Sequence, residues 1–141
     1  MDDGYALLEQ DHRDIEQQLQ SFLRDNDQPV VREVCEHLTR HSQMEDAALY
    51  PALRRWVDGG DDLADRAQQE HVAIATIVAE LYDSTTPERL VERMTDLRDA
   101  VQGHVQFEES EIFPAMRESR VDAHRLASDL QSDGPAGLRA S

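Results

Sequence analysis

The sequence has one cysteine, few basic residues and no long apolar run, and each shortage excludes a class of protein. Cys35 alone can form neither an internal disulfide nor a metal site built from several thiolates. The 14 basic residues stand against 30 acidic ones, which gives a formal net charge of −16. Phosphate backbones and anionic lipid surfaces repel a chain of this charge. We therefore expect neither nucleic acid nor a membrane as a partner.

Length and hydropathy limit the fold and the location. No segment approaches the roughly 20 apolar residues of a membrane span. The first ten residues are acidic and carry no long apolar stretch, so we expect no signal peptide and hence a cytoplasmic protein. A chain of 141 residues is long enough for one helical core and too short for two ordinary domains.

Apolar residues and histidines together keep helical spacing in four long segments. The first covers about residues 4–24, and the second ends near Trp56, before Gly59-Gly60. The third covers about residues 63–81. The fourth begins at Pro87 after a Thr86 cap, because proline has no N–H to leave unpaired at a helix start.

A short fifth segment covers about residues 121–131, and the stretch 132–141 has the composition of a disordered tail. No segment alternates as a strand does. We predict an all-α fold, an antiparallel up-down four-helix bundle over residues 1–131 that includes a short C-terminal helix.

Two stretches of the chain repeat one template. His41-x-x-x-Glu45 is followed by Tyr50-Pro51, and His104-x-x-x-Glu108 is followed by Phe113-Pro114. A single histidine after an acidic residue precedes each stretch, His12 in the first case and His71 in the second. Residues four apart share a helix face, so each His/Glu pair projects in one direction. The repeat predicts two similar helical hairpins related by an approximate twofold axis.

The six repeated side chains are costly in a bundle core unless a metal binds them. Unpaired buried carboxylates cost several kcal/mol each, and a cation removes that cost. Imidazole and carboxylate ligands suit iron, manganese or zinc. Four imidazoles and two bridging carboxylates fill about eight of about twelve octahedral positions, and an oxo or hydroxo bridge fills two more. The predicted ligands are His12, His41, Glu45, His71, His104 and Glu108.

With this His…His-x-x-x-Glu…His…His-x-x-x-Glu pattern, the chain resembles the hemerythrin-like family of HHE cation-binding domains over residues 9–114. The resemblance implies a non-haem centre of two iron ions, with zinc or manganese less favoured. It implies dioxygen or hydrogen peroxide as the bound small molecule. The four histidines would be terminal ligands, and the two glutamates would bridge the ions.

The chain departs from the oxygen-carrying members at two positions. Those members carry a second histidine four residues after the third-helix histidine, where this chain has Ala75. Their last carboxylate stands five residues after the last histidine, which here is Glu109. We choose Glu108, which matches the spacing of His41 and Glu45, and keep Glu109 as the alternative. The missing imidazole predicts a more open centre, better suited to peroxide chemistry, oxygen reduction or sensing than to oxygen carriage.

Two further residues break the symmetry of the repeat. His37 lies one turn before His41, at the position where the other repeat has Ala100. It could be a fifth imidazole ligand, a residue that hydrogen-bonds a ligand, or a solvated side chain. Tyr50 occupies the position in the first repeat that Phe113 occupies in the second. It could bind the metal, hydrogen-bond an oxygen species there, or be an ordinary packed core residue with an anchored hydroxyl. The sequence leaves these alternatives open.

The sequence also leaves the activity open between two functions. One is a di-iron protein that binds or turns over dioxygen or peroxide, with a catalase-like activity and a role in oxidative stress or iron homeostasis. The alternative is a non-enzymatic sensor of iron or oxygen, or an iron-binding protein, whose stability depends on its metal. A metal-free interaction bundle is a third class, for which chelation would change nothing. The oligomeric state, monomer or weak dimer, is not predicted.

Overall fold

The computed structural model describes residues 3–84 and 86–132, and every regular element in them is helical. The described residues contain no strand, so the all-α prediction is confirmed for them. In chain order the elements are α1 (Gly4–Asp25), α2 (Gln28–Met44), the π-helical turn η1 (Glu45–Leu49), α3 (Tyr50–Trp56), α4 (Gly60–Tyr82), α5 (Pro87–Phe107), the π-helical turn η2 (Glu108–Ile112), α6 (Phe113–Arg117) and α7 (Ala123–Ser132).

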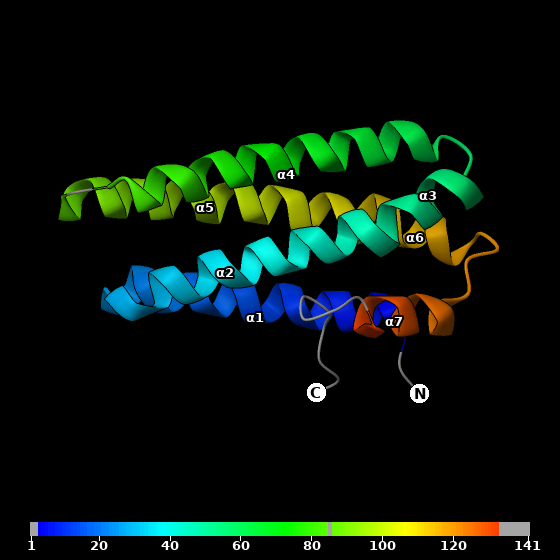
Figure 1. Ribbon diagram of the computed structural model, residues 1–141, viewed down its shortest axis with the longest axis horizontal. Helices are drawn as coiled ribbons and strands as arrows, with labels where there is room; N and C mark the ends of the chain where they lie inside the picture. The colour runs from blue at the N-terminus through cyan, green and yellow to red at the C-terminus, as the bar shows by residue number, and fades with distance from the viewer. Residues whose placement is uncertain (1–2, 85, 133–141) are drawn as a thin grey trace.

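The four long helices lie side by side along the longest axis of the molecule (Figure 1). The helices α1 and α2 contact each other as one hairpin, and α4 and α5 contact each other as a second. The hairpins meet mainly through α1 and α5, whereas α2 and α4 make little contact. The weak α2–α4 contact matters for access to the site described below.

The helix boundaries predicted from capping residues and glycines agree with those in the structure. The side chain of Thr86 accepts a hydrogen bond from the Arg89 N–H at 3.2 Å, as a cap at the start of α5 does. Gly59 has a φ of +74°, a left-handed conformation that glycine adopts without strain, and it separates α3 from α4. The break after α1 falls at Asn26, which also adopts a left-handed conformation.

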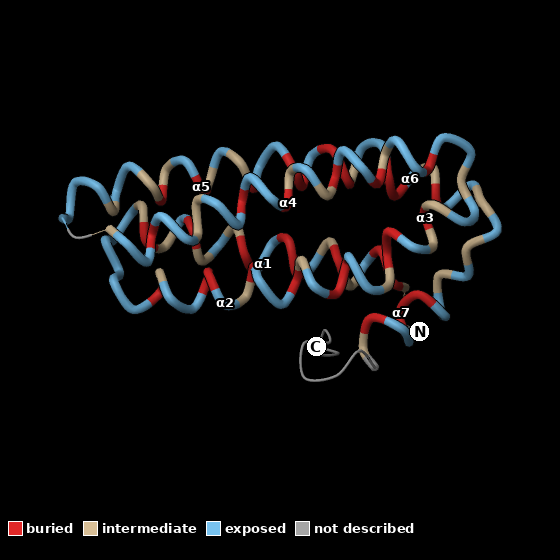
Figure 2. Tube along the Cα trace, turned by 45° about the horizontal axis from the view of Figure 1, so that its top comes forward, coloured by how far each residue is buried: buried red, intermediate tan, exposed pale blue. Residues whose placement is uncertain are grey.

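Two hydrophobic clusters fill the interior on either side of a polar layer. Tyr5, Leu8 and Met44 belong to one cluster, and Ile15 and Leu38 belong to the other. In both α1 and α2 a buried histidine separates the residues of the two clusters. The buried positions follow the inner side of each long helix (Figure 2). A group in this polar layer is therefore shielded from water along the axis of the molecule.

The helix α7 packs against α1 and closes one cluster with Leu126 and Leu130. A Cβ on Gly4 would lie 2.7 Å from Leu126 Cγ, so α7 approaches α1 closely only because residue 4 is glycine. Ser132 is the last residue of α7, and the rest of the predicted tail, residues 133–141, lies outside the described residues.

No helix within residues 3–84 and 86–132 has the length and apolar composition that a membrane crossing requires.

Candidate metal centre

The polar layer contains six buried side chains that converge from four helical segments. The histidines come from α1, from the end of α2, from α4 and from the end of α5, and each glutamate is the first residue of a π-helical turn. All six lie on the inward stripe of their helix, because the 3.6-residue period places them in line with apolar core residues. They are His12, His41, Glu45, His71, His104 and Glu108, the same six residues that the sequence singled out.

These side chains form two groups of four donor atoms, and all atoms of a group lie within 4.8 Å of one another. One group joins His12 and His41 of the first hairpin to the two glutamates, and the other joins His71 and His104 of the second hairpin to the same two glutamates. Glu45 thus belongs to both groups. Two donor sets that share their carboxylates match the ligand arrangement of a pair of adjacent cations.

The outer ring nitrogen of each histidine faces an acidic residue. His12 Nδ1 lies 2.8 Å from Glu109 Oε2, and His41 Nδ1 lies 2.5 Å from Asp11 Oδ2. In the second hairpin, His104 Nδ1 lies 2.8 Å from Glu70 Oε1. Such carboxylates fix the hydrogen on Nδ1 and leave the Nε2 lone pair facing inward, as metal-binding histidines require.

The fourth outer contact is the loosest. His71 Nδ1 lies 3.4 Å from Asp46 Oδ1, at ion-pair distance but without hydrogen-bond geometry. His71 is also the most exposed of the four imidazoles, at 7%.

The first donor group fits a cation, because its buried atoms have no other partner. Four atoms, one from each residue of this group, lack a hydrogen-bond partner among the described residues: His12 Nε2, His41 Nε2, Glu45 Oε2 and Glu108 Oε1. His12 Nε2 nevertheless lies 3.1 Å from Glu108 Oε1, and His41 Nε2 lies 3.2 Å from Glu45 Oε2. Converging lone pairs repel one another unless a proton or a cation lies between them.

Opposite charges within the polar layer shift the pKa values of its buried groups. Burial lowers the pKa of His41, but the charge of Glu45 and the hydrogen bond to Asp11 raise that pKa to about 9. Burial lowers the pKa of His12, but the neighbouring carboxylate of Glu108 raises it well above its ordinary value. The pKa of Glu45 lies well below its ordinary value despite burial, because imidazoles surround it. Without a metal, protons on the histidines balance the carboxylates, and a bound cation has to displace them.

The hydroxyl of Tyr50 lies inside the second donor group. It donates to Glu108 Oε2 at 2.6 Å and also lies 3.0 Å from His71 Nε2 and 3.2 Å from Glu45 Oε1. Burial and the two carboxylates raise the pKa of Tyr50 well above its ordinary value, so the hydroxyl keeps its proton. The repeat partner Phe113 instead stacks on His12, with ring centroids 6.0 Å apart. The two donor groups therefore differ in chemistry.

His37 and Glu109 lie outside both donor groups. Glu109 contacts the outer nitrogen of His12 and also Arg13 at the surface. His37 contacts Asp11, not the converging atoms, at 2.6 Å between Nε2 and Oδ1. Glu109 thus lies behind His12, whereas His37 lies behind Asp11, one residue further from the donor atoms.

Sequence reasoning did not assign the crossed pairing of the acidic residues. Asp11 precedes His12 in the chain but contacts His41, and Glu70 precedes His71 but contacts His104. The available signal is the acidic residue that directly precedes each of the two single histidines, His12 and His71. The choice of partner depends on how the helices pack, which sequence spacing does not reveal.

The π-helical turns that follow each His-x-x-x-Glu pair were also not predicted. Each ends in a backbone bond five residues back, from the Tyr50 N–H to the Glu45 carbonyl and from the Phe113 N–H to the Glu108 carbonyl. A proline follows directly in both repeats, and its ring and missing N–H are incompatible with a regular α-helical turn. A proline inside an otherwise continuous helical pattern was the available signal.

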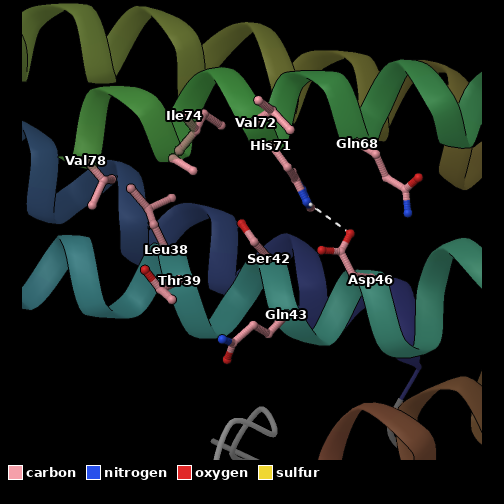
Figure 3. Close-up of a pocket in the computed structure, with 11 residues that line it drawn as sticks. Leu38, Thr39, Ser42, Gln43, Asp46, Gln68, His71, Val72, Ile74 and Val78 are labelled. Atoms are coloured by element: carbon pink, nitrogen blue, oxygen red, sulfur yellow. Dashed lines mark ion pairs between the residues drawn. The ribbon is translucent and has the colours of Figure 1, made fainter. Parts of the chain in front are cut away.

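A groove of about 320 Å³ opens between α2 and α4 beside the second donor group (Figure 3). His71 and Asp46 lie at its polar end, and Leu38, Ile74 and Val78 form an apolar wall. Ala75 also lines the groove. A larger residue at position 75 would occupy this space, so the alanine keeps the approach to His71 open.

Comparison with known proteins gives one family and one relative. The family model of the hemerythrin HHE cation binding domain matches residues 3–116. A protein named DNA nickase from Nostoc sp. (strain PCC 7120 / SAG 25.82 / UTEX 2576) is 28% identical over 117 residues, which cover 79% of this chain. The matched part is 32% of that relative, so the chain spans about one third of its length. No solved structure matches the chain.

Proposed function

Because the chain belongs to the family of hemerythrin HHE cation-binding domains, we propose that it binds two iron ions and uses them to bind or turn over dioxygen or hydrogen peroxide. The observation that carries this proposal is the pair of donor groups that share Glu45 and Glu108. The family and the His/Glu clusters suggest metal binding. The number of ions, their identity and the reaction are our proposal.

Each residue of the centre has a role in this proposal. His12 and His41 are terminal ligands at one position, and His71 and His104 are terminal ligands at the other. Glu45 and Glu108 bridge the positions, because their carboxylates face both pairs of imidazoles. The frame is the antiparallel up-down four-helix bundle predicted from the sequence, with one pair of imidazoles supplied by each hairpin.

A bound pair of iron ions supplies two one-electron redox centres side by side, as a two-electron exchange with peroxide or dioxygen requires. The chain supplies the surroundings. The hydrophobic clusters exclude water on both sides of the layer, and three hydrogen-bonded outer carboxylates fix the rings of His12, His41 and His104. Tyr50 holds a proton at its hydroxyl oxygen, within 3.2 Å of three atoms of the second donor group. It is placed to donate that hydrogen to an oxygen-containing ligand there.

Small molecules enter, in this proposal, through the groove between α2 and α4. The groove ends at His71, the most exposed of the four imidazoles and the one with the loosest outer contact. No imidazole projects from position 75 to fill it. This open side favours turnover or sensing over reversible oxygen carriage.

A peroxide assay tests the enzymatic form of the proposal. Iron-loaded protein should release oxygen from hydrogen peroxide, the metal-free protein should not, and His71→Ala should lose most of the activity. His124→Ala removes an exposed histidine outside the centre and serves as a control. Fully iron-loaded protein that releases no oxygen would exclude a catalase-like activity while leaving oxygen binding to be measured by optical spectroscopy.

The four partnerless buried atoms of the first donor group favour a second function, a sensor whose stability reports metal loading. A metal that binds these converging atoms only in the folded state stabilises that state by mass action. Metal-free protein should therefore melt lower and be digested faster by protease. Equal melting and digestion of the two forms would eliminate the sensor function.

The name of the Nostoc relative refers to DNA, but two thirds of that protein has no counterpart here. We propose that the shared part contributes a metal site and no DNA contact, because this chain carries a net charge of −16. A gel-shift assay with nicked and intact duplex DNA tests this directly. Cytoplasmic location stays a prediction.

A further inference from the structure

His37 is connected to the first donor group through a single carboxylate. Its Nε2 lies 2.6 Å from Asp11 Oδ1, and the other oxygen of Asp11 lies 2.5 Å from His41 Nδ1. On the outer side, His37 Nδ1 lies 3.0 Å from Gln18 Oε1. Four side chains from α1 and α2 thus form a continuous chain from the surface to a proposed metal ligand.

The two oxygens of Asp11 are held by different histidines, which fixes the plane of the carboxylate. Asp11 is 8% exposed, so water offers little competition for either oxygen. With both oxygens engaged, the carboxylate can rotate only by breaking a short hydrogen bond. A fixed Oδ2 in turn keeps the hydrogen of His41 on Nδ1 and its Nε2 lone pair directed inward.

The second hairpin has no counterpart to His37. Ala100 occupies the equivalent position, and Glu70, the equivalent of Asp11, contacts His104 with one oxygen. The other oxygen of Glu70 lies 3.5 Å from the exposed side chain of Arg66. That contact is long and solvent-exposed, so it constrains the carboxylate far less than a buried imidazole does.

We propose that His37 is a positioning residue that strengthens metal binding at the His12/His41 position and not at the His71/His104 position. The inference rests on the proposed two-ion centre, and it makes the two positions unequal in affinity. Removing a group directly behind a metal ligand typically costs about 10–100-fold in affinity. His37 acts one residue further out, so we expect a loss of about tenfold, at the lower end of that range.

The test compares His37→Leu with His37→Gln, because glutamine can place an amide N–H near the position of the imidazole Nε2. Each variant is combined with His71→Ala, which leaves the His12/His41 pair, and with His12→Ala, which leaves the His71/His104 pair. The measurement is the affinity for ferrous iron, obtained by anaerobic titration in a calorimeter. His37→Leu should weaken iron binding about tenfold in the His71→Ala background and not in the His12→Ala background. His37→Gln should restore most of the affinity.

Equal losses in both backgrounds, or equal losses for leucine and glutamine, would show that His37 merely supports the fold and would overturn the inference. Wild-type protein that binds no iron would instead refute the proposed function. The inference is then decided on the metal-free protein by NMR. The Nδ1 hydrogen of His41 should exchange with water faster in His37→Leu than in wild type, while that of His104 is unchanged. Unchanged exchange at His41 would refute the positioning role.

Discussion

Glu45 directs one carboxylate oxygen to each pair of imidazoles. Its Oε2 lies 3.2 Å from His41 Nε2 in the first hairpin, and its Oε1 lies 2.9 Å from His71 Nε2 in the second. Glu108 divides its oxygens in the same way, with Oε1 at 3.1 Å from His12 Nε2 and Oε2 at 3.4 Å from His104 Nε2. In the proposed centre, this divided orientation lets each glutamate serve both positions, with the histidines as terminal ligands.

The first prediction separates shared from terminal ligands by metal content. Glu45→Gln should weaken binding of both ions at least about tenfold, because one carboxylate serves both positions. His12→Ala should leave about one ion per chain. Glu36→Gln, an exposed change on α2, should keep the wild-type content. Metal analysis after dialysis measures this, and a single-ion loss in Glu45→Gln would contradict the shared role.

The second prediction concerns the two fully buried tyrosines. Tyr50→Phe removes the donor to Glu108 and should lower the stability of metal-free protein by about 1–3 kcal/mol. Tyr5→Phe is the matched control, because the Tyr5 hydroxyl is buried and has no hydrogen-bond partner within residues 3–84 and 86–132, so its loss should be neutral or stabilising. Urea unfolding of both variants measures the difference. Equal effects would mean that the Tyr50 hydroxyl has no special place in the site.

The third prediction is that the stabilisation by metal grows as pH rises from about 6.5 to 9. The pKa of His41 is about 9 in the folded metal-free protein and near 6.5 unfolded. A raised pKa contributes stability that is complete below the unfolded value and is lost as pH rises through the folded value. Metal binding needs the neutral imidazole, so fewer protons are displaced at higher pH. Glu45 and Asp11, whose pKa values lie below their ordinary ones, stay ionised throughout.

Thermal melting with and without Zn²⁺, a redox-inert ion for the same ligands, measures this dependence. The difference in melting temperature between the zinc-loaded and metal-free proteins should widen towards pH 9. A difference that is constant or narrows over this range would exclude competition between protons and metal at the histidines.

The fourth prediction tests the groove as the entrance. Ala75→Phe should fill the groove and slow the reaction of iron-loaded protein with peroxide about tenfold or more, with unchanged metal content. Ala79→Phe lies one turn further along α4, is exposed and does not line the groove, so it should react as wild type does. Stopped-flow mixing with hydrogen peroxide gives both rates. Identical rates for the two variants would place the entrance elsewhere.

The sequence predicts those features of the fold and the site that depend on local spacing. Helical periodicity places the histidines within the apolar stripes, and the Thr86 cap and Gly59 mark helix boundaries that the structure reproduces. The six predicted ligands lie in one buried layer for the same reason. The ligand roles themselves stay a prediction.

What the sequence does not predict depends on how the helices pack against one another. Asp11 lies beside His12 in the chain yet contacts His41. The spacing of residues along the chain does not determine this choice of partner. The π-helical turn after Glu45 changes the direction of the Tyr50 side chain. The contact of its hydroxyl with Glu108 therefore cannot be predicted from regular helical spacing either. Long-range pairing of polar side chains needs the relative rotation of helices, which hydrophobic spacing fixes only approximately.

Anomalous diffraction at the iron edge, from crystals of iron-loaded protein, tests the central claim most directly. We predict two peaks per chain in the polar layer, one about 2 Å from Nε2 of His12 and His41 and the other about 2 Å from Nε2 of His71 and His104. Glu45 and Glu108 should lie between the peaks. A single peak, no peak, or peaks outside this layer would contradict the two-ion centre.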